Sequence, residues 1–577
     1  MDVLATTERA WLARSVDGPV IEKLSSSCNI STATATLLYL RGLSTADEAT
    51  QFLAASLSDM ADPGLMADIN RAALRLLSAI KNGEKIIIYG DYDVDGVTST
   101  AVLWLFFRDV FGIQLGSYIP HRLREGYGLN ADAIRTLAED GTQVLVTVDN
   151  GSSANEEARL AKSLGMDVIV IDHHQVSDPE PDVYAHLNPH RQSCGYPYKG
   201  LAAVGVVFLL LVELRRALRV AKTPVKVNPR PDHYLDLVAL GTVADVAPLT
   251  GLNRAIVRYG LTRMKAYCRP GIKAMLTQAG GDILGLSERD FGYKLGPRIN
   301  AAGRLDDATR GLRLLISDDQ DIVDPLARLV EEQNKERKHL QATMTDEALE
   351  MSERSENEAQ SALVFASPEW HPGVVGIVAS RLVETHGKPV ILFAEDGGVL
   401  KGSARSIPGV DVKAALDLCS DKLMRYGGHV AAAGMTLKPS LFDEFRLAFC
   451  DAVDRVKTVS TGLKPVFYDF QLALKDFDRA LLNDLMQVGP FGHGNQAPRI
   501  LSTNVHAAHR ILRGGHLKLL ISTPAGPVDG LAWNRAADAH MLAGPVDLIF
   551  TPDIEVWQGR EKVVFRIEAM RPGECAG

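Results

Sequence analysis

Acidic and imidazole side chains follow three short apolar runs in the first third of the chain, at 86–89, 144–148 and 168–171. Each run is rich in β-branched residues, which is typical of a buried parallel strand. The side chains at the three ends are Asp91, Asp93, Asp95, Asp149, Asp172, His173 and His174. Hard oxygen ligands with one or two imidazoles suit Mg²⁺ or Mn²⁺, and shared carboxylates suit a pair of ions. These residue types therefore predict a two-metal phosphoesterase.

The predicted secondary structure would bring these side chains together. Strands are expected at 85–89, 115–119, 144–148 and 167–171, and helices at 97–108, 154–164, 201–217 and 233–243. This alternation predicts an α/β fold with a doubly wound parallel sheet, in which the carboxyl ends of neighbouring strands open on one crevice. Asp91, Asp93 and Asp95 would share one face of an extended segment, roughly 7 Å apart at each step.

The 577 residues are too many for one hydrophobic core, and sequence patterns divide them into five parts. Residues 1–65 predict short helices, 66–325 the catalytic α/β domain, and 326–358 a long, charged and solvated connecting helix without Gly or Pro. Residues 359–458 predict a second, smaller α/β domain. From 459 to 577, short β-rich runs separated by Gly and Pro predict a small barrel or sandwich.

Composition narrows the class of protein. A hydrophobic content of 46% and a charged content of 23% are those of a soluble globular protein. The net charge of −9 gives no overall sign of a polyanion partner, so nucleic-acid binding would need a local basic surface. The six cysteines are scattered, which indicates neither a zinc site nor a disulfide framework and favours the reducing cytoplasm. We expect no signal peptide and no membrane partner, since the longest apolar stretch, 201–212, is too short to span a bilayer.

Two other motifs begin in the same way as residues 91–96. An EF-hand loop also reads Asp-x-Asp-x-Asp-Gly, but Val102 replaces its final bidentate Glu, and a strand rather than a helix precedes it. A haloacid-dehalogenase-type phosphatase would use Asp93 as nucleophile and Asp95 as its acid/base partner. That interpretation leaves the Asp-His-His at 172–174 unexplained. Taken singly, each strand end would also suit an ordinary turn or loop, but three of them in one domain favour a common site.

The motifs resemble those of the DHH phosphoesterase superfamily, named for Asp-His-His. Its pattern recurs at 91–96, 149–151 and 172–174, and residues 241–249 are similar to a fourth motif. The resemblance implies one cation held by Asp93 and Asp149, and a second held by Asp95, Asp149, His173 and Asp245. It also implies that Asp149 bridges the two ions. Asp91 and His174 would then be catalytic, with His174 facing the substrate phosphate.

Later motifs make the resemblance more specific, from the superfamily to one family within it. Residues 296–305, 370–377, 427–434 and 489–495 resemble, in the same order, signatures of the RecJ family of exonucleases. This implies an enzyme that degrades single-stranded DNA from its 5′ end to mononucleotides with two Mn²⁺ or Mg²⁺ ions, in recombination and repair. Single-stranded DNA, a single-strand-binding protein and a helicase are the implied partners.

The same resemblance implies substrate contacts on both sides of the connecting helix. The implied residues are Arg298, Asn300, Arg304, Ser403, Arg405, Gly427, Gly428 and His429. Arginine suits a terminal phosphate, and glycine lets backbone N–H groups approach an anion. The C-terminal β region resembles an OB-type single-strand-binding fold, in which Trp533, Trp557 and Phe565 are candidates either to stack on bases or to lie in the core.

Two alternative functions remain to be weighed. A phosphodiesterase for short oligonucleotides or cyclic dinucleotides would share the catalytic core, but usually lacks a long C-terminal β region. A non-catalytic replication scaffold with the DHH fold would tend to lose metal ligands, and every expected acid and both histidines are present here. The sequence therefore favours the exonuclease.

Overall fold

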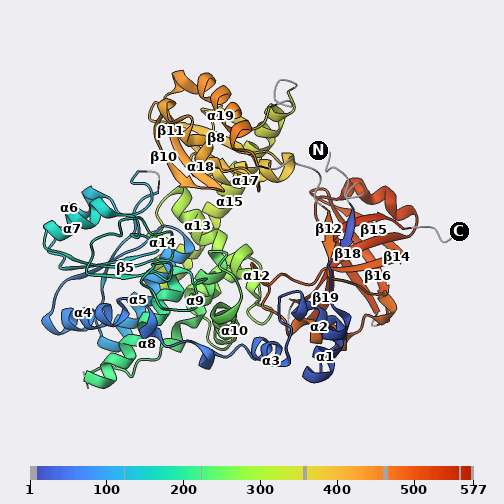
Figure 1. Cartoon of the computed structure of the whole chain (residues 1–577), viewed down its shortest axis with the longest axis horizontal. Helices are drawn as coiled ribbons and strands as arrows, with labels where there is room; N and C mark the ends of the chain where they lie inside the picture. The colour runs from blue at the N-terminus through green and yellow to red at the C-terminus, as the bar shows by residue number, and fades with distance from the viewer. Residues whose placement is uncertain are drawn as a thin grey trace.

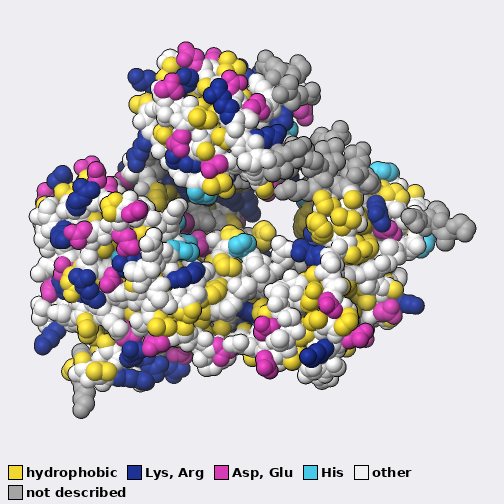
Figure 2. All heavy atoms as spheres, viewed as in Figure 1, with side chains coloured by type: hydrophobic (Ala, Val, Ile, Leu, Met, Phe, Trp, Pro, Cys, Tyr) yellow, Lys and Arg dark blue, Asp and Glu magenta, His cyan; other side chains and the backbone are white. Residues whose placement is uncertain are grey.

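The computed structural model describes residues 10–122, 124–221, 224–354, 360–458, 465–524, 526–557 and 560–573. Figure 1 shows three lobes: the blue-to-green part of the chain, the yellow-to-orange part above it, and the red C-terminal part with the dark-blue N-terminal helices beside it. The space-filling view shows a hollow between the three lobes (Figure 2). Within these ranges, no helix has both the length and the apolar composition of a membrane span.

Five parallel strands form the sheet of the first lobe, in the order β3-β2-β4-β5-β6. They are β2 (Ile86–Tyr89), β3 (Gly116–Tyr118), β4 (Val144–Val148), β5 (Asp167–Ile171) and β6 (Ala185–Leu187). One face is covered by α4 (Ile69–Asn82), α5 (Val94–Phe111) and α8 (Ala203–Ala221), and the other by α6 (Ala131–Glu139) and α7 (Asn155–Ser163). Alternate strand residues enter the two cores: Ile88 and Val146 pack on one face, Ile87 and Val168 on the other. The predicted doubly wound α/β fold is confirmed.

The first acidic loop differs from its prediction. The helix α5 begins at Val94 rather than at residue 97, because the Asp93 carboxylate accepts hydrogen bonds from the N–H groups of Asp95 (2.9 Å) and Gly96 (3.1 Å). Asp95 therefore lies in the first helical turn, and the expectation of one extended face carrying Asp91, Asp93 and Asp95 is wrong. A Cβ on Gly96 would lie 2.5 Å from the Asp91 nitrogen, so the tight turn requires glycine.

The lobe continues through a run of helices to the connecting helix. These are α9 (Leu235–Ala244), α10 (Gly251–Ala266), α11 (Pro270–Gln278), α12 (Glu288–Asp290), the π-helical turn η5 (Phe291–Leu295), α13 (Gly296–Leu305), α14 (Thr309–Ile316) and α15 (Gln320–Ser352). The long helix α15 begins before Pro325, because Asp319 caps it by accepting a hydrogen bond from Asp321. Its first half packs into the core of the first lobe and its second half, around Met344 and Ala348, into the second lobe. The helix is thus embedded at both ends rather than solvated along its length.

A five-stranded mixed sheet forms the second lobe, in the order β10-β11-β9-β8-β7. Its strands are β7 (Leu363–Ser367), β8 (Val390–Asp396), β9 (Val399–Arg405), β10 (Leu423–His429) and β11 (Ala432–Leu437). The helices are α17 (Val375–His386), α18 (Val412–Asp417) and α19 (Phe442–Val456). The register aligns His429 with Ala432 and Arg405, and Gly427 with Gly434 and Ser403, across three neighbouring strands.

A seven-stranded, mostly antiparallel sheet forms the third lobe. Its strands are β13 (Phe470–Gln471), β14 (Ile500–Val505), β15 (Ala507–Leu512), β16 (His516–Thr523), β17 (Gly526–Ala532), β18 (Val546–Trp557) and β19 (Arg560–Pro572). The N-terminal helices α1 (Gly18–Cys28), α2 (Thr32–Tyr39) and α3 (Ala46–Ala54) and the later α20 (Arg479–Met486) share its hydrophobic core. The strand β1 (Trp11–Ala13) also pairs with β12 (Val466–Tyr468). The N-terminal segment thus packs with the C-terminal end of the chain (Figure 1).

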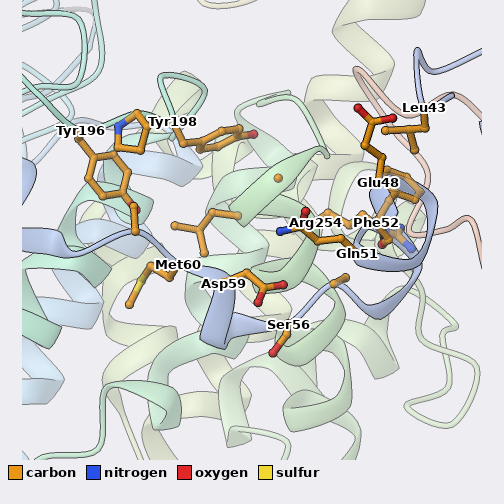
Figure 3. A pocket seen from close by; sticks show the side chains of 15 residues that line it. Leu43, Glu48, Gln51, Phe52, Ser56, Asp59, Met60, Tyr196, Tyr198 and Arg254 are labelled. Atoms are coloured by element: carbon orange, nitrogen blue, oxygen red, sulfur yellow. Dashed lines mark hydrogen bonds between the residues drawn. The ribbon is translucent and has the colours of Figure 1, made fainter. Parts of the chain in front are cut away.

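A buried arginine joins the third lobe to the first. Arg254, on α10, is 1% exposed and donates hydrogen bonds to the carbonyl oxygens of Phe52 (2.9 Å), Gln487 (2.9 Å), Val488 (2.8 Å) and Gly489. Figure 3 shows it beside Phe52 in a cavity of about 430 Å³. Burial lowers the pKa of Arg254 to about 10, which leaves it charged at neutral pH. Carbonyl groups of the third lobe therefore surround a cation of the first lobe, and these hydrogen bonds hold the two lobes together.

Arg254→Met should destabilise the protein by about 2–4 kcal/mol, because several buried carbonyl groups lose their donor together. Arg258→Met is the matched control: Arg258 also donates to two carbonyl groups, those of Leu53 and Ala54, but at an exposed position. Its cost should stay below about 1 kcal/mol. Urea unfolding followed by circular dichroism measures both. Equal midpoints for the two variants would contradict the role given to Arg254.

Candidate metal centre

The strand ends of the first lobe bring carboxylates and imidazoles into one cluster. Ligand atoms lie within 4.8 Å of one another in three overlapping sets: Asp91, Asp93 and Asp149; Asp95, His173 and Asp245; and Asp149, His173 and His174. Two residues belong to two sets each, namely Asp149 and His173. The cluster can therefore hold adjacent cations that share a carboxylate.

Asp149 occupies the middle of the cluster. Its φ of 64° is left-handed, and its N–H donates to the Ile171 oxygen (2.9 Å), which turns the side chain off the end of β4. The Asp149 Oδ1 atom lies 3.3 Å from His173 Nε2 and 3.7 Å from His174 Nδ1. Among the described residues, the buried Oδ1 atoms of Asp149 and Asp91 and the His173 Nε2 atom have no hydrogen-bond partner. Unpartnered oxygen and nitrogen atoms that face one another fit a hard divalent cation.

Asp95 and Asp245 complete the cluster from helix ends. Both Asp95 carboxylate oxygens accept N–H groups at the start of α8, from Ala203 (2.7 Å) and Val204 (2.9 Å), and Oδ2 lies 3.8 Å from His173 Nε2. Asp245 follows the last residue of α9, and its Oδ2 lies 3.8 Å from His173 Nδ1. Each carboxylate is thus placed by backbone structure before any ion binds.

The buried, closely spaced carboxylates of the cluster favour the binding of positive charge. Burial, together with the neighbouring carboxylates, raises the pKa values of Asp91 and Asp149 well above the usual range. The same causes raise the pKa of Asp95 to about 7 and that of Asp245 to about 9. Without cations, these groups bind protons in the folded protein at pH values where the unfolded chain has lost them.

Divalent cations should therefore stabilise the folded protein more strongly as the pH rises. The raised carboxyl pKa values favour the metal-free fold at low pH, and this contribution is lost as pH climbs through about 7 and about 9. A cation competes with those protons, so its affinity increases over the same range. At a hundredfold excess over Kd, Mg²⁺ should add about 2.7 kcal/mol. Thermal unfolding with Mg²⁺ or EDTA, at about pH 6 and about pH 8.5, measures this. A shift independent of pH, or one retained in Asp149→Ala, would contradict the assignment.

Asp172 orients the two histidines rather than joining the ligand sets. Its Oδ1 atom accepts the N–H groups of His173 (2.8 Å) and His174 (3.1 Å) and lies 2.8 Å from His174 Nδ1, while Oδ2 accepts the Ser152 N–H (3.0 Å). Burial would raise the pKa of Asp172, but the bond to His174 holds it well below its usual range. Burial would likewise lower the pKa of His174, yet the bond to Asp172 raises it to about 9. Burial and the charge of His174 lower the pKa of His173 to about 4. His173 is thus neutral and able to bind metal, whereas His174 is a cation.

A second cluster, of cations, lies where the second lobe meets the first. Arg405 donates from Nη1 to Ser403 Oγ (2.9 Å), and a Cβ on Gly376, at the start of α17, would lie 2.9 Å from both Ser403 Oγ and an Arg405 nitrogen. Arg304 donates to the Gly373 oxygen (3.1 Å). Within the described residues, neither guanidinium has a carboxylate partner. Burial, helped by the neighbouring arginines, lowers the pKa of Arg304 to about 9. These two arginines, which have no carboxylate partner among the described residues, fit an anion such as a terminal phosphate.

Arg122 is a further member of this cluster and lies outside the sequence motifs. Its charge lowers the pKa values of both Arg304 and Arg405, after the larger effect of burial, and its guanidinium lies 4.7 Å from the centre of the Tyr92 ring. Arg122 follows β3, so the rule that site residues follow strand ends could have found it.

Other predicted substrate contacts lie in different surroundings. Arg298 is 5% exposed and forms an ion pair with Glu331 (2.6 Å), so it joins α13 to α15 instead of offering a free cation. Asn300 is partly buried, and its contact with substrate stays a prediction. The three residues Gly427, Gly428 and His429 are exposed on the edge strand β10. The register places His429 two strands from Arg405, roughly 10 Å away.

The three aromatic candidates of the third lobe also differ in their surroundings. Phe565 lies in the core, with its ring centre 4.2 Å from that of Phe550, so of its two predicted roles the structure selects the core. Trp533 is 55% exposed and packs edge-on against His516 at 4.7 Å. The side chain of Trp557 lies outside the described residues.

Comparisons with known proteins agree with this arrangement. Residues 85–242 match the DHH family N-terminal domain, 359–454 the DHHA1 domain, and 468–569 the RecJ OB domain. The single-stranded-DNA-specific exonuclease RecJ of Bacillus subtilis is 36% identical over 97% of this chain and 70% of its own length. The Dickeya dadantii protein of the same name is 38% identical over 90% of this chain and 93% of its own length. The crystal structure of RecJ in complex with Mn²⁺ from Thermus thermophilus matches with a TM-score of 0.80 and 29% identity, over 98% of this chain and 80% of that one. The chain belongs to the RecJ family of the DHH superfamily.

Proposed function

We propose that this chain is a metal-dependent exonuclease that hydrolyses single-stranded DNA. The observation that carries the proposal is the pairing of two clusters: partnerless carboxylate and imidazole atoms at the strand ends, and unpaired arginines beside them. The first suits two cations at a phosphodiester, and the second suits the phosphate at a strand end. The names of the RecJ relatives support the substrate class, and the RecJ structure with Mn²⁺ supports the cofactor.

The residues around the cations would have distinct roles. One ion would be held by Asp93 and Asp149, and the other by Asp95, Asp149, His173 and Asp245. When bound, the two cations supply positive charge at the scissile phosphate and acidify a water molecule. His174, held as a cation by Asp172, can donate to a phosphate oxygen as negative charge develops. Asp91 offers a ligand atom within 4.8 Å of those of Asp93 and Asp149, so it would act at the ion that those two residues hold.

The cluster of cations would set the direction of degradation. Arg304, Ser403 and Arg405 would hold the 5′ phosphate, with Arg122 adding charge, so that the next phosphodiester bond reaches the cations. The enzyme would then act 5′→3′ and release mononucleotides. The exposed glycines and His429 on β10 would contact the same end of the strand. Partnership with a single-strand-binding protein and a helicase, and action in the cytoplasm, are parts of the proposal that rest on the resemblance to the family.

Cleavage of three substrates tests the substrate class. We expect Mn²⁺-dependent release of mononucleotides from a long single strand, with little from the blunt duplex of the same sequence and slow cleavage of a dinucleotide. Rapid cleavage of the dinucleotide, with the long strand left intact, would favour the short-oligonucleotide phosphodiesterase instead. Failure to cleave any of the three substrates with saturating Mn²⁺ would favour the non-catalytic replication scaffold.

A further inference from the structure

A fully buried amide joins the loop that carries Asp149 to the loop that carries the two histidines. Asn188 follows β6, the last strand of the parallel sheet, and is 0% exposed. Its Nδ2 atom donates one hydrogen bond to Ser152 Oγ (2.8 Å), in the loop after β4, and another to the His174 carbonyl oxygen (2.9 Å), in the loop after β5. Its Oδ1 atom accepts the His190 N–H (2.8 Å). A single side chain thus connects three loops at the carboxyl edge of the sheet.

Hydrogen bonds close a ring through this amide. Asn188 donates to the Ser152 hydroxyl, and the Ser152 N–H donates to Asp172 Oδ2 (3.0 Å). Asp172 Oδ1 accepts the His174 N–H (3.1 Å), and the His174 carbonyl group leads back to Asn188. All four residues lie in or beside the loops that follow β4, β5 and β6. Because the ring is closed, one loop cannot shift relative to the next without breaking a buried hydrogen bond.

The Ser152 hydroxyl connects the ring to a buried histidine. His186, on β6, is 2% exposed, and its Nε2 atom lies 3.0 Å from Ser152 Oγ. Burial, with the charge of Arg191, lowers the pKa of His186 to about 4, so its imidazole is neutral at pH 7. Its Nδ1 atom faces the Glu180 carboxylate at 3.7 Å, which favours the tautomer with the proton on Nδ1. The Nε2 atom then accepts the Ser152 hydroxyl proton, and this leaves the oxygen lone pairs of Ser152 to Asn188.

The loops that Asn188 joins meet in the middle of the metal centre. Ser152 lies three residues after Asp149, and His174 directly follows His173. The Asp149 Oδ1 and His173 Nε2 atoms lie 3.3 Å apart, so the distance between these two ligand atoms depends on how the loops are held. A small divalent cation tolerates little change in such distances. Partners that orient metal ligands are accordingly worth about ten- to a hundredfold in metal affinity or activity.

We propose that Asn188 is a positioning residue of the metal centre, which fixes the loop of Asp149 against the loop of His173. For its effect on cleavage, this inference rests on the proposed function. The position requires an amide, because Asn188 uses two N–H donors and one acceptor at once. An aspartate there would lack both donors, and an apolar side chain would lack all three bonds. Ser152 and His186 hold the amide in place from the side away from His174.

Asn188→Ala tests the positioning through two measurements. On a 5′-phosphorylated single strand with saturating Mn²⁺, kcat should fall about ten- to a hundredfold, while KM should stay within about twofold, because the groups that hold the strand are unchanged. The Mn²⁺ concentration that gives half of the maximal rise in thermal stability should increase about tenfold, and this measurement needs no cleavage. Ser152→Ala, which removes one side-chain bond of the ring, should change both quantities in the same direction but less, and it carries the test if Asn188→Ala does not fold. The double variant should lose little more than Asn188→Ala alone.

Asn495→Ala is the matched control, because Asn495 is equally buried (0%) and donates to two carbonyl oxygens, those of Val488 (2.9 Å) and Pro490 (2.7 Å), but lies in the third lobe. It should lower the midpoint of thermal unfolding and leave kcat and the Mn²⁺ requirement unchanged. The same outcome for folded Asn188→Ala and Ser152→Ala proteins would overturn the positioning and leave the exonuclease intact. A parent protein without Mn²⁺-dependent digestion of single strands would overturn the proposed function, whereas the Mn²⁺ requirement for thermal stabilisation would still decide whether Asn188 positions the metal ligands.

Discussion

Asp149→Ala should lower strand cleavage about a thousandfold or more, the largest effect expected of any single substitution in this protein. Asp149 is the carboxylate common to two of the ligand sets, and its partnerless Oδ1 atom lies 3.3 Å from His173 Nε2. Removing it disturbs both cations at once, and each contributes several kcal/mol of charge stabilisation in the transition state. The initial rate of nucleotide release from a labelled single strand, with saturating Mn²⁺, measures the loss.

Asp132→Asn is the matched control, because Asp132 is an exposed carboxylate in the first turn of α6, in the same lobe. It should keep nearly full activity. Circular dichroism establishes that both variants are folded. A folded Asp149→Ala protein that kept a tenth of the parent rate would show that the cations do not share this residue. Asp245→Ala should also lose activity, though less, since Asp245 belongs to only one ligand set.

Arg405→Ala should weaken binding of 5′-phosphorylated strands roughly ten- to a hundredfold, which corresponds to about 1.5–3 kcal/mol for one charge-assisted phosphate contact. Arg405 has no carboxylate partner among the described residues and contacts Ser403, so its charge is free for a ligand. The variant should also discriminate less than the parent between 5′-phosphate and 5′-hydroxyl ends. Competition between the two kinds of strand in one reaction measures this preference.

The control for this variant is Arg381→Ala, which removes an arginine of α17 that is already paired with Glu384 (3.1 Å). It should leave the preference unchanged. The Mg²⁺-dependent rise in thermal stability should persist in Arg405→Ala, since the metal ligands lie in the first lobe. An Arg405→Ala protein with the parent's preference and affinity would place the terminal phosphate elsewhere.

The sequence predicted the parts of the site that depend on local pattern. Short β-branched runs mark buried parallel strands, and the strand-end rule then places Asp149 and His173 in one crevice, as the structure shows. The start of α5 was harder to predict, because a carboxylate expected to bind metal, Asp93, also caps the helix. A periodic pattern does not show that one side chain serves two purposes.

Contacts between distant segments could not be predicted from local pattern. Arg298 lies in a motif that resembles a substrate site, yet its partner Glu331 is brought to it only by the packing of α13 against α15. The N-terminal helices carry no motif, and their place in the C-terminal core depends on residues such as Leu37 and Phe477, which lie at opposite ends of the chain. Phe565 shows the converse, because an aromatic residue in a β-strand suits a core as well as it suits a binding surface.

One measurement decides between the proposed exonuclease and its rivals: the digestion of a single strand labelled at one end or the other, with Mn²⁺ and with EDTA. With Mn²⁺, a 5′ label should appear at once as a mononucleotide, whereas a 3′ label should pass through a ladder of progressively shorter strands. EDTA should stop both reactions, because the carboxylate cluster acts only with its cations. Immediate release of the 3′ label, or equal digestion in EDTA, would contradict an enzyme that holds the 5′ end beside a two-metal centre.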